Sequence, residues 1–170
     1  MYQIEGGIFM LKEKEKMFRY IDAVAPQMAA MSDDIFDHPE LGLNEYHAFA
    51  LLTDWLEQEG FAVERGVAGV ETAFRAIYHH GNGGPNIGLL CEYDALPEIG
   101  HACGHQLQGP SILAAAAALK NSEADGNYTV TVYGTPAEES VSGKIMMLKN
   151  GCTFEELDVA LMMHGSGATQ

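Results

Sequence analysis

Basic residues are scarce in this sequence. Nine lysines and arginines stand against 24 aspartates and glutamates, which gives a formal net charge of -15 at pH 7. Such a surface repels phosphate groups, so the composition argues against nucleic acid and anionic membranes as partners. The excess of carboxylates suits divalent cations, although it is more often only a solubilising surface.

Long apolar runs are also missing. The longest covers residues 112–119 and is too short to cross a bilayer. Near the N-terminus, residues 12–16 alternate in charge where a signal peptide would need an apolar core. Cysteine is sparse and odd in number, with Cys91, Cys103 and Cys152, so the thiols cannot all pair with one another. We therefore expect a cytoplasmic protein whose reduced thiols are free to bind a metal.

Hydrophobic periodicity predicts an α/β domain. The expected helices cover residues 9–35, with a kink or interruption at Pro26, and residues 45–59, 111–120 and 143–150. The expected strands cover residues 61–66, 72–78, 86–92, 128–133 and 159–163. Strands that alternate with helices favour a mainly parallel sheet flanked by helices, and 170 residues suffice for one such domain.

The densest group of metal-binding side chains is His101, Cys103 and His105. These residues occupy every second position, so in an extended segment they would share one face. Imidazole and thiolate are ligands that zinc prefers. Taken alone, the cluster is equally compatible with a buried cysteine and structural histidines.

Candidate ligands follow each of three predicted strands. Asp94 and the cysteine-histidine cluster come after the first, Glu138 and Glu139 after the second, and His164 after the third. Functional sites of open α/β sheets gather beyond the carboxyl ends of the strands, so we expect these positions to converge.

The adjacent glutamates can divide the work of a hydrolytic site. One carboxylate can bind a metal while the other accepts a proton from water and passes it to a leaving amine. The competing interpretation of Glu138 and Glu139 is a solvated acidic pair or a helix N-terminal charge patch. Four further histidines are interpreted as surface or turn residues: His38, His47, His79 and His80.

Four ordered motifs resemble one metalloenzyme family. They are Glu-Tyr-Asp-Ala-Leu-Pro at 92–97, Gly-His-Ala-Cys-Gly-His at 100–105, Gly-Thr-Pro-Ala-Glu-Glu at 134–139 and Ala-Leu-Met-Met-His at 160–164. The chain resembles the co-catalytic metallopeptidases and amidohydrolases related to aminoacylase-1 and carboxypeptidase G. Within them it is most similar to the branch of aminobenzoyl-glutamate hydrolases and indoleacetyl-amino-acid hydrolases.

The resemblance implies roles for individual residues. Two divalent ions, zinc or manganese, would hydrolyse the amide bond of an N-acyl-amino acid, an aminobenzoyl-glutamate-like compound or a dipeptide. Glu138 would be the general base, and Asp94 would orient a metal-bound histidine from outside the metal's own ligand shell. The implied metal ligands are Cys103, His105, Glu139 and His164. No substrate-binding residue is assigned, and His101 has no ligand counterpart.

The chain also departs from the family pattern. Gln106 stands where this branch usually has Asn or Asp, which alters the hydrogen bonding behind the metals. Relatives carry a lid domain that forms homodimers, and a further metal-binding histidine beyond it. We therefore expect residues 1–170 to be the N-terminal portion of a zinc-peptidase catalytic domain, incomplete at its C-terminal side and weakly active alone.

Two alternatives to an enzyme remain open. The chain could be a noncatalytic binding module that kept the fold and lost the chemistry. It could also be a structural zinc domain, although structural sites are usually closed cages of Cys and His, whereas Glu138 and Glu139 favour an open site.

Overall fold

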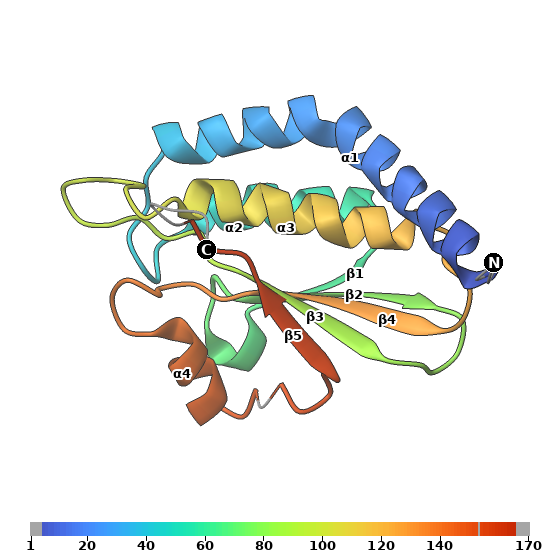
Figure 1. Cartoon of the computed structure of the whole chain (residues 1–170). Helices are drawn as coiled ribbons and strands as arrows, with labels where there is room; N and C mark the ends of the chain where they lie inside the picture. The colour runs from blue at the N-terminus through green and yellow to red at the C-terminus, as the bar shows by residue number, and fades with distance from the viewer. Residues whose placement is uncertain (1–4, 153, 166–170) are drawn as a thin grey trace.

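The computed structural model describes residues 5–152 and 154–165. Its elements follow the order of the prediction, with one short 3-10 helix, η1, added (Figure 1). The helices are α1 (Glu5–Asp37), α2 (Tyr46–Gln58), η1 (Val67–Gly69), α3 (His105–Lys120) and α4 (Gly143–Lys149). The strands are β1 (Ala62–Arg65), β2 (Phe74–His80), β3 (Asn86–Cys91), β4 (Tyr128–Gly134) and β5 (Val159–Met162).

The five strands form one sheet in the order β1-β2-β4-β3-β5. Strand β3 pairs in parallel with both β4 and β5, whereas the pairings β1 with β2 and β2 with β4 are antiparallel. The predicted α/β class is confirmed, and the parallel arrangement holds in the half of the sheet that carries the candidate ligands. The antiparallel half arises because the short turn between β1 and β2 contains no crossover helix.

Helices cover the two faces of the sheet unequally (Figure 1). Helices α2 and α3 lie over one face with α1 outermost, and α4 lies beneath the other. Leu52, Trp55 and Leu113 pack with Val130 in the larger core, on the side of the three long helices. A smaller cluster on the opposite side includes Tyr133 and Met147. Burial on both faces explains why β3 and β4 carry near-continuous apolar sequences.

Helix α1 is longer than expected and passes through Pro26. Proline removes one backbone hydrogen bond and bends a helix without necessarily ending it. Figure 1 shows that the helix bends partway along its length. The predicted kink is therefore compatible with one continuous element.

Helix α3 begins at His105, six residues before the predicted start. Gly104, with φ 89°, takes the left-handed conformation just before it, and a turn precedes that glycine. The extended segment expected for His101, Cys103 and His105 is therefore wrong. A turn and a helix start replace the alternation, because Gly104 permits a reversal that other residues resist.

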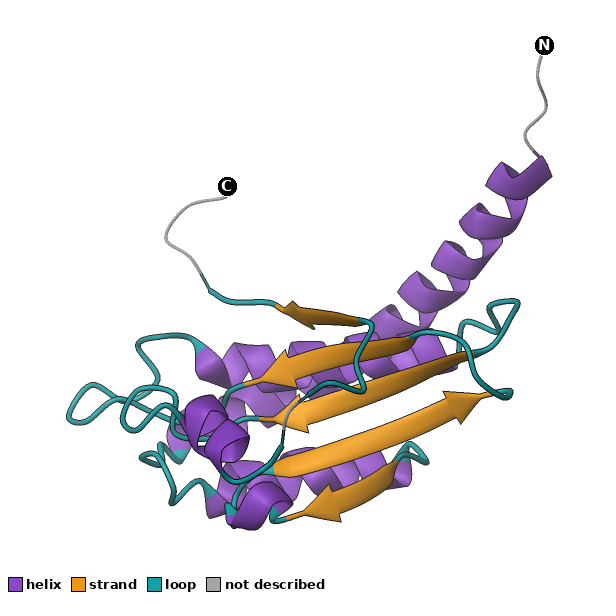
Figure 2. Ribbon diagram, turned by 90° about the horizontal axis from the view of Figure 1, so that it is seen from below, coloured by secondary structure: helices purple, strands orange, loops and turns teal. Residues whose placement is uncertain are grey.

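Strand β5 forms one edge of the sheet (Figure 2). All four of its residues are exposed, although Val159, Leu161 and Met162 are apolar. Among residues 5–152 and 154–165, no helix has both the length and the hydropathy needed to cross a membrane.

Candidate metal centre

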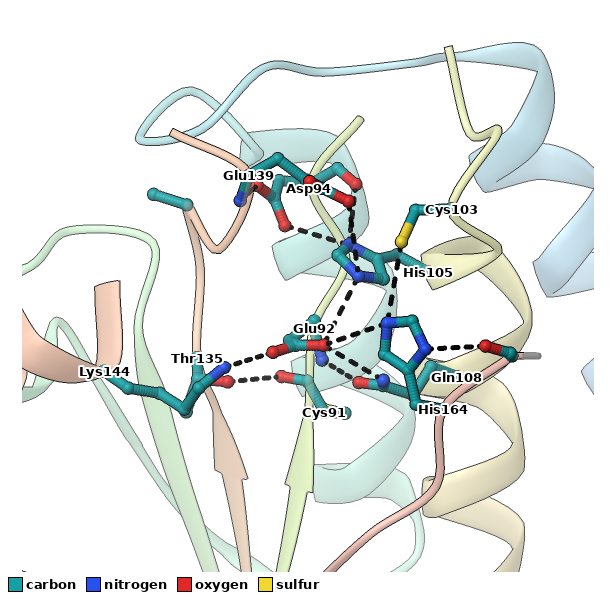
Figure 3. Close-up of polar contacts among 12 residues, drawn as sticks. Cys91, Glu92, Asp94, Cys103, His105, Gln108, Thr135, Glu139, Lys144 and His164 are labelled. Carbon is teal, nitrogen blue, oxygen red and sulfur yellow. Dashed lines mark hydrogen bonds and ion pairs between the residues drawn. The ribbon is translucent and has the colours of Figure 1, made fainter. Parts of the chain in front are cut away.

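The carboxyl ends of the parallel strands bring the predicted ligands together. Asp94 comes three positions after β3 ends, Glu138 and Glu139 come shortly after β4, and His164 lies two positions beyond β5. Helix α3 adds His105 at its first residue, with Cys103 in the preceding turn. Figure 3 shows Asp94, Cys103, His105, Glu139 and His164 directed at a common region.

The ligand atoms form two overlapping groups. Potential ligand atoms of Cys103, His105 and His164 lie within 4.8 Å of one another, as do those of His105, Glu138 and Glu139. Cys103 Sγ is 3.5 Å from His164 Nε2. Thus the structure brings together every predicted ligand and the predicted base. Among the described residues, His101 belongs to neither group, although it is buried.

Asp94 fixes the orientation of His105. The Nδ1 atom of His105 lies 3.0 Å from both the Asp94 backbone oxygen and Oδ1. The other Asp94 oxygen accepts a 2.9 Å hydrogen bond from the Glu139 backbone N–H. One carboxylate therefore ties the imidazole to the glutamate loop, the arrangement by which carboxylates orient metal-binding histidines.

Two buried polar atoms at this point have no hydrogen-bond partner. They are His105 Nε2 and Glu139 Oε1, which lie 3.9 Å apart. Buried polar atoms are normally paired, because leaving one unsatisfied costs about 1–3 kcal/mol. An imidazole nitrogen and a carboxylate oxygen, with the nearby thiol of Cys103, are a donor set that zinc accepts. The residues therefore fit a divalent ion.

The charges favour a cation here. Burial opposes ionisation of Asp94, but its hydrogen bonds with His105 and the Glu139 N–H outweigh that effect and lower its pKa. Burial likewise disfavours a charged His105, yet Asp94 raises the pKa of this imidazole. A hydrogen bond with Glu139, assisted by burial, raises the pKa of Cys103 to about 12. Without a cation the thiol therefore keeps its proton at neutral pH, and an incoming metal must displace it.

Glu92 is a further buried acid that sequence patterns did not single out. Its Oε2 lies 3.3 Å from His105 Nε2, accepts a 3.1 Å hydrogen bond from Gln108 Nε2 and is 4.0 Å from His164 Nε2. Lys144 of α4 pairs with its other oxygen (Figure 3). Lys144 is 52 positions away in sequence, so nothing local could have predicted the pair.

Glu45 supports the glutamate loop from behind. Its fully buried carboxylate accepts hydrogen bonds of 2.7 Å from the Ala137 backbone N–H and 2.9 Å from Thr72 Oγ1. Ala137, with φ 57°, precedes Glu138. The same loop presses on Gly42, where an added Cβ would lie 2.9 Å from the Ala137 Cα. The segment that joins α1 to α2 therefore shapes the backbone that presents both glutamates.

An α/β fold with clustered thiol, imidazole and carboxylate groups defines a protein with a candidate metal centre. Residues 88–170 match the model of peptidase family M20/M25/M40. Xaa-Arg dipeptidase from Mus musculus is 41% identical over 165 residues, covering 90% of this chain and 38% of the relative. A p-aminobenzoyl-glutamate hydrolase from Escherichia coli is 36% identical over 173 residues, covering 88% and 35%. The chain belongs to peptidase family M20/M25/M40, which confirms the resemblance.

Solved structures agree on the fold. A Bacillus subtilis protein described as a dinuclear metal binding peptidase of this family is 27% identical, with a TM-score of 0.72 over 85% of this chain and 44% of that one. An aminobenzoyl-glutamate utilization protein from Klebsiella pneumoniae, at 19% identity and a TM-score of 0.71, shares the fold over 85% of this chain and 45% of that one. The chain spans less than half the length of each of these four proteins.

Proposed function

We propose that this chain carries the metal centre of a hydrolase that cleaves the amide bond of a dipeptide, an N-acyl-amino acid or an aminobenzoyl-glutamate-like compound. The observation that carries the proposal is the convergence of unpartnered His105 Nε2 and Glu139 Oε1 beside Cys103. The names of the mouse and Escherichia coli relatives support the class of substrate.

Each residue of the centre has a role in this proposal. Cys103, His105, Glu139 and His164 would hold zinc or manganese, and Asp94 would keep His105 Nε2 directed at the ion. A bound divalent ion supplies Lewis acidity to a water and to the amide carbonyl. The carboxylate of Glu138 accepts a proton from that water and delivers it to the nitrogen of the leaving amine.

The ligand geometry bears on how many ions are held. Because Asp94 occupies Nδ1 of His105, that imidazole can serve only one ion through Nε2. Four ligands can complete a first ion and leave a second one short of protein donors. We therefore infer that a second ion, as in the dinuclear Bacillus subtilis neighbour, binds less tightly to this chain than the first.

The wider setting of the centre follows from the same proposal. We infer that residues 1–170 are the N-terminal portion of a catalytic domain, and that a lid domain serves dimerisation in the complete enzyme. The reduced state of Cys103 that metal binding needs favours the cytoplasm.

The test is Glu138→Gln in a version extended to the length of the relatives, with hydrolysis of a dipeptide panel and bound metal measured together. We expect unchanged metal content and activity reduced by at least about 100-fold, the scale of lost general-base catalysis. Glu15→Gln, which changes an exposed glutamate of α1, is the matched control. Undiminished hydrolysis in Glu138→Gln would refute the role of the base. A chain that retains no metal would favour the noncatalytic module.

A further inference from the structure

A second group of ligand-type side chains lies where α1 ends and α2 begins. Asp34 is in the last turn of α1, His38 directly follows that helix, and His47 is the second residue of α2. One ligand atom from each lies within 4.8 Å of the other two. Sequence patterns predict both histidines to be isolated surface residues, because the intervening turn that folds them together has no metal-binding signature.

The carboxylate of Asp34 lies between the two imidazoles. Its Oδ1 is 2.9 Å from His38 Nδ1 and 3.1 Å from His47 Nε2. The ring centroids are 4.7 Å apart and the ring planes are tilted by 52°. Ligand atoms held about 2.0–2.1 Å from a tetrahedral zinc lie about 3.3 Å from one another. The observed spacings therefore need only a slight outward movement to admit an ion.

We propose that Asp34, His38 and His47 form a second divalent-metal site, selective for zinc-like ions and separate in its residues from the centre at Cys103. Two imidazole nitrogens with one carboxylate oxygen suit zinc, nickel or copper rather than magnesium or calcium, which prefer oxygen ligands. Three protein ligands and the exposure of His38 leave the remaining position to water.

The surroundings of the site favour a cation and hold the ligands in place. Asp33 and Asp37 flank the site in sequence and add negative charge. The Glu40 carboxylate accepts hydrogen bonds from the backbone N–H groups of His47 and Ala48, which fixes the start of α2. The cost of binding is the loss of the contact between His38 Nδ1 and the Asp34 backbone oxygen, now 2.8 Å.

The position of the site gives metal binding a structural consequence. The turn that it would close also contains Glu40, whose backbone oxygen accepts a 2.8 Å hydrogen bond from the Ala95 N–H. Leu41 in the same turn forms a bridge with Ala95, the neighbour of Asp94. An ion bound to His38 and His47 would fasten the two helices around a turn that contacts the segment carrying Asp94.

The test uses the full chain in a background that disables the first centre, Cys103→Ser with His164→Ala. Zinc affinity is measured by competition with a chromophoric chelator, and coordination by X-ray absorption. We expect about one zinc per chain with nitrogen and oxygen neighbours at about 2.0–2.1 Å. Adding His38→Ala should weaken zinc binding at least about ten-fold.

Two more variants separate metal binding from local structure. His47→Gln keeps a donor for Asp34 but is a poor zinc ligand, so it should also lose at least about ten-fold in affinity. His79→Ala removes a histidine on a different element, strand β2, and should change nothing. Zinc affinity that is equal in the background, His38→Ala and His47→Gln chains, or no zinc binding in the background, would overturn the proposal.

Discussion

At the scale of single residues, the candidate centre depends on buried charges that compensate one another. Glu92 is enclosed by His105, Gln108 and Lys144, and only the lysine among these carries a permanent positive charge. A buried carboxylate without a cation nearby is costly, because its hydration is lost. Lys144 therefore neutralises an acid that would otherwise repel the electrons of the neighbouring ligands.

Replacing this lysine should destabilise the fold. We expect Lys144→Met to lower the free energy of unfolding by about 3 kcal/mol, because it leaves Glu92 buried and unpaired. Lys149→Met is the matched control, since Lys149 is exposed on the same helix, and it should stay within about 0.5 kcal/mol of the parent. Urea denaturation gives both values. Equal effects of the two substitutions would show that Glu92 does not need its cation.

The orienting role of Asp94 predicts a loss of metal affinity without a loss of fold. Asp94→Asn keeps the size of the side chain but removes the negative charge that His105 contacts. Zinc binding should weaken by about 10–100-fold, the usual effect of changing a residue that orients a ligand. Competition with a chelator measures it, with Asp22→Asn as a control at an exposed position of α1. Unaltered affinity would remove Asp94 from the centre.

At the scale of elements, the connection between α1 and α2 is coupled to the loop after β4. Burial raises the pKa of Glu45 by more than the hydrogen bonds from Thr72 and Ala137 lower it. The folded chain thus binds this proton more tightly than the unfolded chain. Stability from Glu45 is consequently full below the ordinary glutamate pKa and is lost as pH rises through the folded-state value.

This linkage predicts a pH dependence that a neutral side chain should remove. Between about pH 4 and pH 7, the free energy of unfolding of the parent should fall relative to that of Glu45→Gln, by about 1.4 kcal/mol for each unit by which the folded pKa exceeds the unfolded one. Urea denaturation of both chains across this range measures the difference, in which other titrating groups cancel. A constant difference would show that Glu45 has the same pKa in both states.

The elements also show what sequence patterns could and could not predict. Apolar periodicity located the strands, and the rule for strand ends placed Glu139 and His164 at one edge, because both depend on local signals. The start of α3 was missed because Gly104 allows a turn that the alternation of His101 and His105 concealed. The pairs Glu92 with Lys144 and Glu45 with Ala137 depend on tertiary packing between distant segments, which local patterns do not encode.

At the scale of the whole molecule, the charge is the dominant feature. The net charge of -15 leaves most acids without a basic partner, so the folded chain repels itself. A few surface pairs oppose this repulsion, among them Arg65 with Asp54 and Arg75 with Glu64. Exposed pairs contribute only about 0–1 kcal/mol each, so general repulsion should prevail.

Monovalent salt should therefore stabilise the chain. Raising NaCl from about 0.02 M to 0.2 M shortens the screening length from about 20 Å to 7 Å, which weakens repulsion across the surface more than contacts at ion-pair distance. We expect the midpoint of thermal unfolding to rise at pH 7, and to rise less near the sequence pI of about 4.6, where the net charge vanishes. EDTA in every sample keeps divalent ions from binding at Cys103 or His38 and producing the same effect. A midpoint that falls with salt at pH 7 would mean that the surface ion pairs, rather than the excess of acids, set the electrostatic balance.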